Sequence, residues 1–335
     1  MTTDLRTRYL GLDLAHPLVA SASPLTGNID TLLALQQAGV AAVVMPSLFE
    51  EQIEHDAMAA HHAIEFGAEL SPESSGGYFP ELDRYNTGPE HYVEMLRQAR
   101  NELRVPVIAS LNGTTVGGWT RYAQLLADAG ADALELNVYL VAADVTMNSM
   151  SVEAQYVRLV ESVRATIDIP LAVKIGPYFS SVGAMAQRLV DAGADGLVLF
   201  NRFYLPDIDL DELDVVPHLT LSSPGSIQLP LRWIAILHNR INASLAASSG
   251  VHDATDAVKL ILAGADAVMM TSALLMHGPE HVTTVLAGLQ RWFNDRDYLS
   301  VAQAKGSVSQ LHTPDPVAFE RSNYMHALTS YSPSH

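Results

Sequence analysis

The sequence predicts an α/β protein that folds as one (β/α)₈ (TIM) barrel. Its 335 residues exceed the roughly 250 of a typical barrel without reaching two domains of ordinary size. Short apolar segments alternate with helical ones, and a recurring Ala-Gly phrase marks the turns from helix to strand. We therefore expect a single domain, with the barrel over about 16–295 and a C-terminal extension over about 296–335.

The recurring phrase occurs four times, each time between a helical pattern and an apolar run. The copies are Ala38–Ala42, Ala129–Ala133, Ala192–Gly196 and Ala263–Ala267. Glycine just after the last helical turn takes the left-handed conformation that ends a helix, and small alanines let the helix approach the sheet. Four such turns are the repeat expected of helices that alternate with parallel strands.

Eight apolar segments have the length of buried strands. They are Leu18–Ser21, Ala42–Pro46, Val107–Leu111, Leu134–Val138, Leu171–Ile175, Leu197–Asn201, Leu245–Ser248 and Val268–Thr271. Between them, apolar residues recur at helical spacing, as in Tyr122–Ala129. Two connections are long, Glu50–Arg104 after the second strand and Phe203–Ala243 after the sixth. Both follow strands, so in a barrel they lie on the face where active sites form.

Composition excludes several classes of function. The formal charge of −18 argues against binding to nucleic acid or to an anionic membrane surface. The chain has no cysteine, which excludes disulfides, thiolate metal sites, iron–sulfur clusters and a cysteine nucleophile. No apolar run has the length of a membrane span, and Met1–Tyr9 lacks a signal-peptide pattern. We expect a soluble, cytoplasmic protein.

Polar residues interrupt or follow four of the predicted strands near their C-terminal ends. They are Asn112, Asn137, Lys174 and Asn201. For any single asparagine, a capping role or a bond to a loop is the simpler interpretation, but that interpretation weakens for the set. A lysine within a buried strand needs a charge or several acceptors to offset its desolvation. Lys174 therefore favours a ligand with anionic or electron-rich atoms.

The seventh and eighth strands run into turns that carry hydroxyl groups and lead to helices. The residues are Ser249, Gly250, Thr271 and Ser272. In barrels the loops after these two strands are the usual phosphate site, where backbone N–H groups and a helix N-terminus face the anion. Ordinary helix capping is the alternative, and the position on these two strands favours phosphate binding.

With these residues placed, the chain resembles the dihydroorotate dehydrogenase family of FMN-containing barrels from Leu10 to about Ser307. The matching stretches are Pro17–Ala22, Pro106–Gly113, Ala129–Asn137, Val173–Tyr178, Ser249–His252 and Ala263–Ser272. The resemblance implies that Lys174 lies beside N1 and O2 of the flavin, where a fixed cation stabilises the negative charge of the reduced ring. Asn137 and Asn201 are then expected to bind flavin or substrate.

The rest of the expected FMN site follows from the same resemblance. The first-strand segment is expected to line the flavin, and the two hydroxyl-bearing turns are expected to hold its phosphate. Ser47 and Asn112 complete the cofactor site that we predict. Besides Asn137, Lys174 and Asn201, its residues are Ala20, Ser21, Ala22, Ser47, Asn112, Ser249, Gly250, Thr271 and Ser272.

The chain departs from the family pattern where substrate chemistry takes place. Pro46 occupies the place of a lysine that touches flavin and substrate, and Leu221–Ser226 replaces a Gly-Gly loop. Leu140 occupies the place of the Cys or Ser base, and Ala142 that of a substrate-binding asparagine. Neither Leu nor Ala takes a proton or holds a carboxylate. Tyr139 is the best-placed substitute base, although a phenol with a pKa near 10 needs a strongly lowered pKa to serve.

Three functional hypotheses remain open. The leading one is an FMN-dependent dehydrogenase acting on a CH–CH group, nominally dihydroorotate to orotate in pyrimidine biosynthesis, with Lys174, Asn137 and Tyr139 as its catalytic residues. The second is a flavin-binding accessory protein, or an oxidoreductase with a different small substrate, that has lost dihydroorotate turnover. The third is a barrel without flavin that binds a sugar phosphate at the same loops.

Other clusters are weighed against these hypotheses. The acidic segment Glu50–Asp56 with His61 and His62 is better interpreted as a solvated helix than as a metal site, because it lacks a closed ligand set. No metal is expected. A small-molecule substrate is the expected partner, and a redox partner protein and a homodimer are left open. Further candidate substrate contacts at strand ends are Tyr139, Tyr178, Arg202 and Tyr204.

Overall fold

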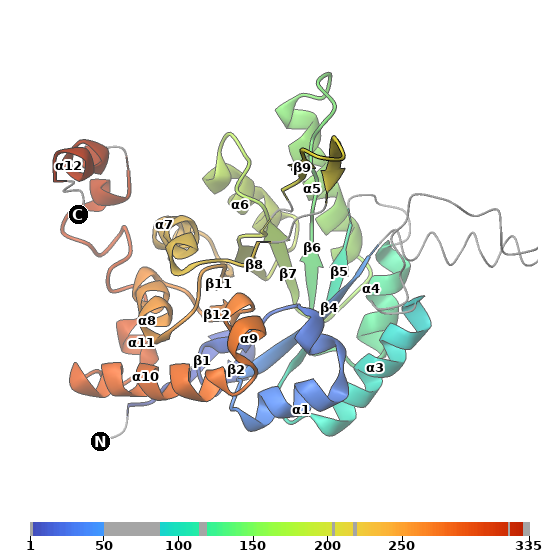
Figure 1. The fold of residues 1–335 in the computed structure, drawn as a ribbon, viewed down its shortest axis with the longest axis horizontal. Helices are drawn as coiled ribbons and strands as arrows, with labels where there is room; N and C mark the ends of the chain where they lie inside the picture. Colours follow the sequence, from blue (N-terminus) through green and yellow to red (C-terminus); the bar gives the residue numbers. More distant parts are fainter. Residues whose placement is uncertain are drawn as a thin grey trace, which may run out of the picture.

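The computed structural model describes residues 3–49, 88–113, 119–202, 205–216, 220–320 and 322–330. Its centre is a closed barrel of eight strands, each parallel to its neighbours (Figure 1). In order around the barrel they are β11 (Ser244–Ser248), β12 (Ala267–Met270), β3 (Leu18–Ala20), β4 (Ala42–Phe49), β5 (Val107–Asn112), β6 (Ala133–Asn137), β7 (Leu171–Ile175) and β8 (Gly196–Leu199). The predicted fold class is confirmed.

Strand β4 runs further than its apolar pattern indicated. It reaches Phe49, and its register against β5 shifts between Val44 and Ser47. Pro46 lies inside this irregularity, where its missing N–H is tolerated because a shifted register leaves one residue outside the ladder. The shift carries Ser47 and Phe49 to the C-terminal end of the barrel.

Helices surround the barrel and cover the outer faces of its strands (Figure 1). They are α1 (Ile29–Gln37), α3 (Gly88–Glu102), α4 (Trp119–Asp128), α5 (Ser149–Arg164), α6 (Val182–Asp191), α7 (Gln228–Leu237), α8 (Ala254–Ala263) and α10 (His281–Asp295). Shorter helical elements are η1 (Pro24–Gly27), η4 (Pro224–Ile227), α9 (Ser272–His277), α11 (Val301–Ala304), η5 (Pro316–Phe319) and α12 (Ser322–Ser330). Within the described ranges, no helix combines the length and apolarity that a membrane span requires.

Two hairpins lie outside the barrel. The first pairs β1 (Thr7–Tyr9) with β2 (Leu12–Leu14), and it packs against the N-terminal ends of the barrel strands. There the Leu10 N–H donates to Ser244 Oγ at 3.0 Å. The second hairpin pairs β9 (Asp207–Asp209) with β10 (Asp214–Val216) within the long connection that follows β8.

The barrel strands are buried on both faces, so their side chains divide into two apolar layers. One layer points outward and packs against the helices. The other fills the barrel and is sealed by the side chains of Tyr9, Leu10 and Leu14 from the first hairpin. Alternation along each strand produces this division, because successive side chains point to opposite faces. Above the inner apolar layer, the interior of the barrel becomes polar.

The aspartates of the repeated phrase tie neighbouring strands together. In three of the four copies, the aspartate side chain accepts the backbone N–H at the start of the preceding strand at 2.8 Å, and its own N–H donates back to the carbonyl of the same residue. The pairs are Asp132 with Val107, Asp195 with Leu171, and Asp266 with Leu245. The first copy has Ala41 in this place and keeps only the backbone bond to Leu18. The repeat therefore fixes both the turn and the register.

Replacing Asp195 with alanine tests this role. We expect the free energy of unfolding to fall by about 1–3 kcal/mol, because the partly buried N–H of Leu171 loses its acceptor. Asp195→Asn keeps an oxygen acceptor and should lose less. Urea unfolding measures both variants, with Asp191→Ala on the exposed side of α6 as the control. Equal losses in Asp195→Ala and Asp191→Ala would contradict the assignment.

Candidate functional site

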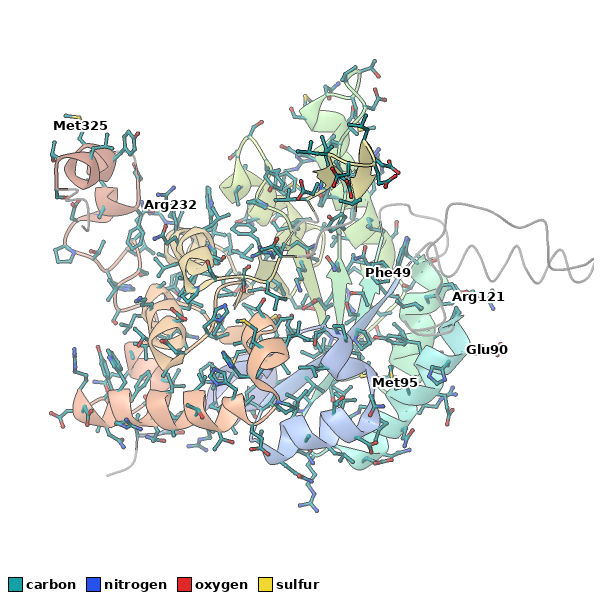
Figure 2. All side chains as sticks on the ribbon, viewed as in Figure 1. Phe49, Glu90, Met95, Arg121, Arg232 and Met325 are labelled. Carbon is teal, nitrogen blue, oxygen red and sulfur yellow. The ribbon has the colours of Figure 1, made fainter. Side chains whose placement is uncertain are left out.

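The C-terminal ends of the barrel strands surround a cavity of about 340 Å³, which we call the cofactor cavity. Most of the predicted cofactor residues line it: Ala22, Ser47, Asn112, Asn137, Lys174, Asn201, Ser249, Gly250, Thr271 and Ser272. Phe49, labelled in Figure 2 at the end of β4, belongs to the same wall. Residues from all eight barrel strands or the turns that follow them, separated by more than 200 positions in the chain, thus meet around one space.

Several predicted site residues lie elsewhere. Ala20 points into the outer apolar layer, and Ser21 is buried within hydrogen-bond distance of Lys174. Tyr139 is partly buried, does not line the cofactor cavity, and is followed by Leu140, which packs against the core. Tyr204 and the acidic segment 50–56 with His61 and His62 lie outside the described residues.

Lys174 forms a buried ion pair beneath the cofactor cavity. Its ammonium lies 3.4 Å from Glu135 Oε1 and 3.4 Å from the hydroxyl of Ser21. The side chains of Lys174 and Glu135 are 9% and 1% exposed, respectively. An opposite charge at this distance offsets part of the cost of burying the ammonium group. The ion pair places the ammonium of Lys174 at the floor of the cavity.

Glu135 was missed by the sequence analysis, although the signal was present. It lies two residues before Asn137 on β6, so the two side chains share the inner face of the strand. A carboxylate in the middle of a five-residue buried strand needs a partner, and β7 on the next position of the barrel supplies Lys174. Only the closed barrel brings the two together, because the sequence separates them by most of a helix-containing repeat.

The polar floor of the cavity is incompletely satisfied. Glu135 Oε2 and the hydroxyl of Tyr9 are buried and have no hydrogen-bond partner among the described residues. Burial raises the pKa of Tyr9, and the nearby charges of Glu135 and Asp266 raise it further. Buried polar atoms without partners are rare in native proteins and often mark functional positions. Glu135, one of the two, forms the ion pair with Lys174 through its other carboxylate oxygen.

Asn137 and Asn201 lie next to each other at the ends of β6 and β8. The side-chain amide of Asn201 donates to Oδ1 of Asn137. The amide nitrogen of Asn137 and the amide oxygen of Asn201 have no hydrogen bond within the described part of the chain. The pair thus presents one donor and one acceptor to the cofactor cavity, and a capping role does not account for either residue.

The turns after β11 and β12 differ from ordinary helix caps. Ser249 and Gly250 follow β11 with φ of +86° and +81°, and α8 is capped further on by Asp253. Thr271 stands at the start of α9, yet its side chain makes no capping hydrogen bond. The sequence left helix capping open as the alternative role of these residues. Helix capping does not explain Ser249 or Thr271. Among the described residues neither hydroxyl has a hydrogen-bond partner, so both are placed to bind an anion.

Ser222 joins these two turns to the long connection after β8, a link that the sequence analysis missed. Its N–H donates to Ser272 Oγ at 3.0 Å, and its hydroxyl lies 3.3 Å from Nε2 of His252. Ser222 belongs to the segment that replaces the Gly-Gly loop of the family pattern. A serine therefore holds the connection against both turns at the place where the family uses glycine.

Comparison with known proteins agrees with this geometry. Residues 82–293 match the family model described as dihydroorotate dehydrogenase. The chain is 30% identical over 226 residues to a putative dihydroorotate dehydrogenase A (fumarate) of Aeropyrum pernix, covering 65% of this chain and 72% of that protein. It is 24% identical over 310 residues to the catalytic subunit of a dihydroorotate dehydrogenase B (NAD(+)) of Methanothermobacter thermautotrophicus, covering 90% and 97%. A family match over more than half of its length, on a closed eight-stranded barrel with polar strand ends, shows that the chain belongs to the dihydroorotate dehydrogenase family.

Proposed function

We propose that the protein is an FMN-dependent oxidoreductase of the dihydroorotate dehydrogenase type, nominally oxidising dihydroorotate to orotate. The observation that carries the proposal is one cavity that joins Lys174, which is ion-paired with Glu135, to the turns at Ser249–Gly250 and Thr271–Ser272. These turns offer hydroxyls and backbone N–H groups to an anion. FMN needs both features, a cation beside its ring and donors around its phosphate.

The residues around the cofactor cavity fit FMN. The hydroxyls of Ser249 and Thr271 are not used as helix caps, and the successive left-handed residues Ser249 and Gly250 turn the backbone sharply between β11 and α8. The cavity of about 340 Å³ falls within the range of roughly 300–1,000 Å³ usual for cofactor sites. When bound, FMN would supply the hydride acceptor, which no side chain can provide.

The chain's own residues would then orient the ring and stabilise its reduced form. Lys174, positioned by its ion pair with Glu135, would oppose the negative charge that develops near the ring. Asn137 and Asn201 would offer one donor and one acceptor to ring or substrate atoms. This arrangement needs no rearrangement of the polar floor during the reaction, because the ion pair is already in place.

A second candidate is an oxidoreductase of the same type with a different small substrate. It is favoured by Leu140, which occupies the place of the base and packs against the apolar core. Tyr139 remains our candidate base on chemical grounds. Tyr139→Phe should lower the rate of flavin reduction while leaving FMN affinity unchanged.

Anaerobic mixing of the FMN-loaded protein with dihydroorotate tests the proposal. The nominal reaction predicts that the visible flavin absorbance bleaches and that orotate appears in equal amount. Retained flavin without bleaching would favour the second candidate. Failure of the purified protein to take up FMN would contradict both.

A further inference from the structure

A second space opens beside the cofactor cavity. This side compartment has a volume of about 390 Å³. Its walls come from the turn after β7, the end of β8, and the segment from η4 to the first turn of α7. The residues that line both spaces are Asn201, Arg202, Thr220, Ser248 and Ser249. A ligand in either space can therefore contact the guanidinium of Arg202 and the hydroxyl of Ser249.

The charges around the two spaces have one sign. Among the described residues that line them, Lys174 and Arg202 are cations and none is a carboxylate. Lys174 is committed to Glu135, whereas Arg202 forms no ion pair within the described ranges. The chain as a whole carries a formal charge of −18. A cleft lined only by positive charge on an acidic protein selects an anion.

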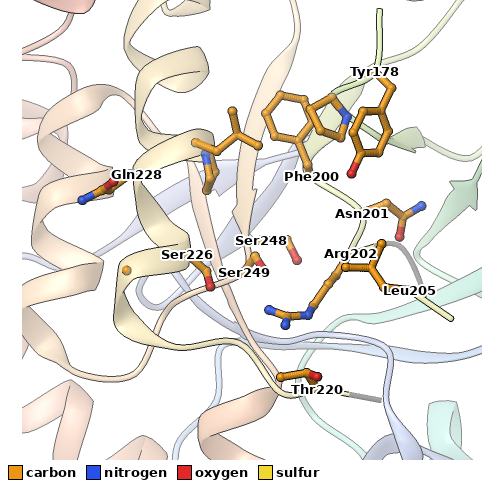
Figure 3. Close-up of a pocket in the computed structure, with 14 residues that line it drawn as sticks. Tyr178, Phe200, Asn201, Arg202, Leu205, Thr220, Ser226, Gln228, Ser248 and Ser249 are labelled. Atoms are coloured by element: carbon orange, nitrogen blue, oxygen red, sulfur yellow. The ribbon is translucent and has the colours of Figure 1, made fainter. Parts of the chain in front are cut away.

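Arg202 is directed into the side compartment. In Figure 3 the guanidinium of Arg202 lies between the side chains of Thr220 and Ser249, which line the same space. In this view the rings of Tyr178 and Phe200 lie farther from the guanidinium, beyond Ser249. The planar guanidinium presents paired donors that match the two oxygens of a carboxylate, and hydroxyl donors beside it add further bonds. The rings offer an apolar wall for the rest of a ligand.

Arg202 also borders the cofactor cavity. Arg202 directly follows Asn201, which lines the cofactor cavity. Of the two cations that line this cavity, Lys174 is paired with Glu135, whereas Arg202 has no ion-pair partner among the described residues.

We propose that Arg202 binds the carboxylate of a substrate that extends from the cofactor cavity into the side compartment and that is larger than a single small ring. The chemical class is a carboxylate with an apolar or aromatic substituent, which packs against Tyr178 and Phe200. The inference rests on the second candidate of the proposed function, an oxidoreductase whose substrate differs from dihydroorotate, with the reacting part of that substrate over FMN. Arg202 is then a specificity-determining residue.

Binding of 3-phenylpropionate, compared with its neutral amide, tests the inference. Isothermal titration calorimetry on the protein with and without FMN should show binding of the acid and at least about tenfold weaker binding of the amide. Arg202→Gln should weaken binding of the acid by about 10- to 100-fold, the range expected for lost hydrogen bonds to a charged group. Arg232→Gln, on α7 outside both spaces, removes the same charge and should leave binding unchanged.

The outcomes separate this inference from the proposed function. Equal affinities for acid and amide, or equal weakening by Arg202→Gln and Arg232→Gln, would overturn the role of Arg202. Arg202-dependent binding to a protein that takes up no FMN would uphold the side compartment and refute the flavin proposal. Arg202→Lys should recover part of the affinity, because it restores the charge without the planar fork.

Discussion

Replacing Lys174 with methionine is expected to lower the free energy of unfolding by about 3–5 kcal/mol, the cost of removing one partner from a buried ion pair. Methionine fills much of the volume of lysine, so the loss reports the charge and not a cavity. In this variant Glu135 would lose its ion-pair partner and stay buried, because its side chain is 1% exposed and its Oε2 has no partner among the described residues. The cost of desolvating its carboxylate would then no longer be offset. Urea unfolding monitored by circular dichroism measures the change.

A double variant isolates the pair. Lys174→Met combined with Glu135→Leu should recover most of the lost stability, because replacing a whole buried ion pair with apolar residues is often neutral or better. The double variant should nevertheless reduce its flavin at a more negative potential than the natural protein, since the cation beside the ring is gone. Additive effects of the two substitutions on stability would contradict the coupling that the 3.4 Å contact implies.

Replacing Gly250 with alanine is expected to damage the phosphate end of the cofactor cavity. Gly250 has φ of +81°, and an added Cβ would stand 2.3 Å from the backbone nitrogen of Ile227 and 2.8 Å from the carbonyl carbon of Ser226. Both are backbone atoms of η4, so neither can swing away. The strain should lower the free energy of unfolding by more than about 1 kcal/mol, and displacement of the turn should weaken FMN binding at least about tenfold.

Gly183→Ala is the matched control. Gly183 lies in α6, and an added Cβ there would meet nothing within 4 Å. Its FMN affinity should equal that of the natural protein, and its stability should be equal or slightly higher because alanine is the better helix former. Flavin fluorescence titration compares the two variants. An unchanged FMN affinity in Gly250→Ala would remove the turn after β11 from the cofactor site.

The barrel could be predicted from sequence because its signals are local. Each repeat carries its own glycine turn and apolar strand, and Asp132, Asp195 and Asp266 add a bond that spans only one repeat. The two hairpins, β1–β2 and β9–β10, escaped prediction because strands of three residues are too short to display an alternating pattern.

The site could be predicted in part for the same reason. Residues at strand ends, such as Asn137 and Thr271, are placed by the topology of any such barrel, and they line the cofactor cavity. Ala20 could not be placed, because a shift of one position on a strand turns a side chain from the inner to the outer face. Glu135 carries a local signal, a carboxylate within a buried strand, but its partner Lys174 lies on the next strand of the barrel. The sequence offered Arg202 as a candidate substrate contact, but only the folded barrel shows that it lines both spaces.

The central claim is that this chain holds FMN by its phosphate at the turns after β11 and β12 and by its ring at Lys174. Titration of the apoprotein with FMN and with riboflavin, followed by the change in flavin absorbance, tests it most directly. We expect saturable binding of FMN at one site per chain and at least about tenfold weaker binding of riboflavin, which lacks the phosphate. No spectral change with FMN, or equal affinities for the two flavins, would contradict it.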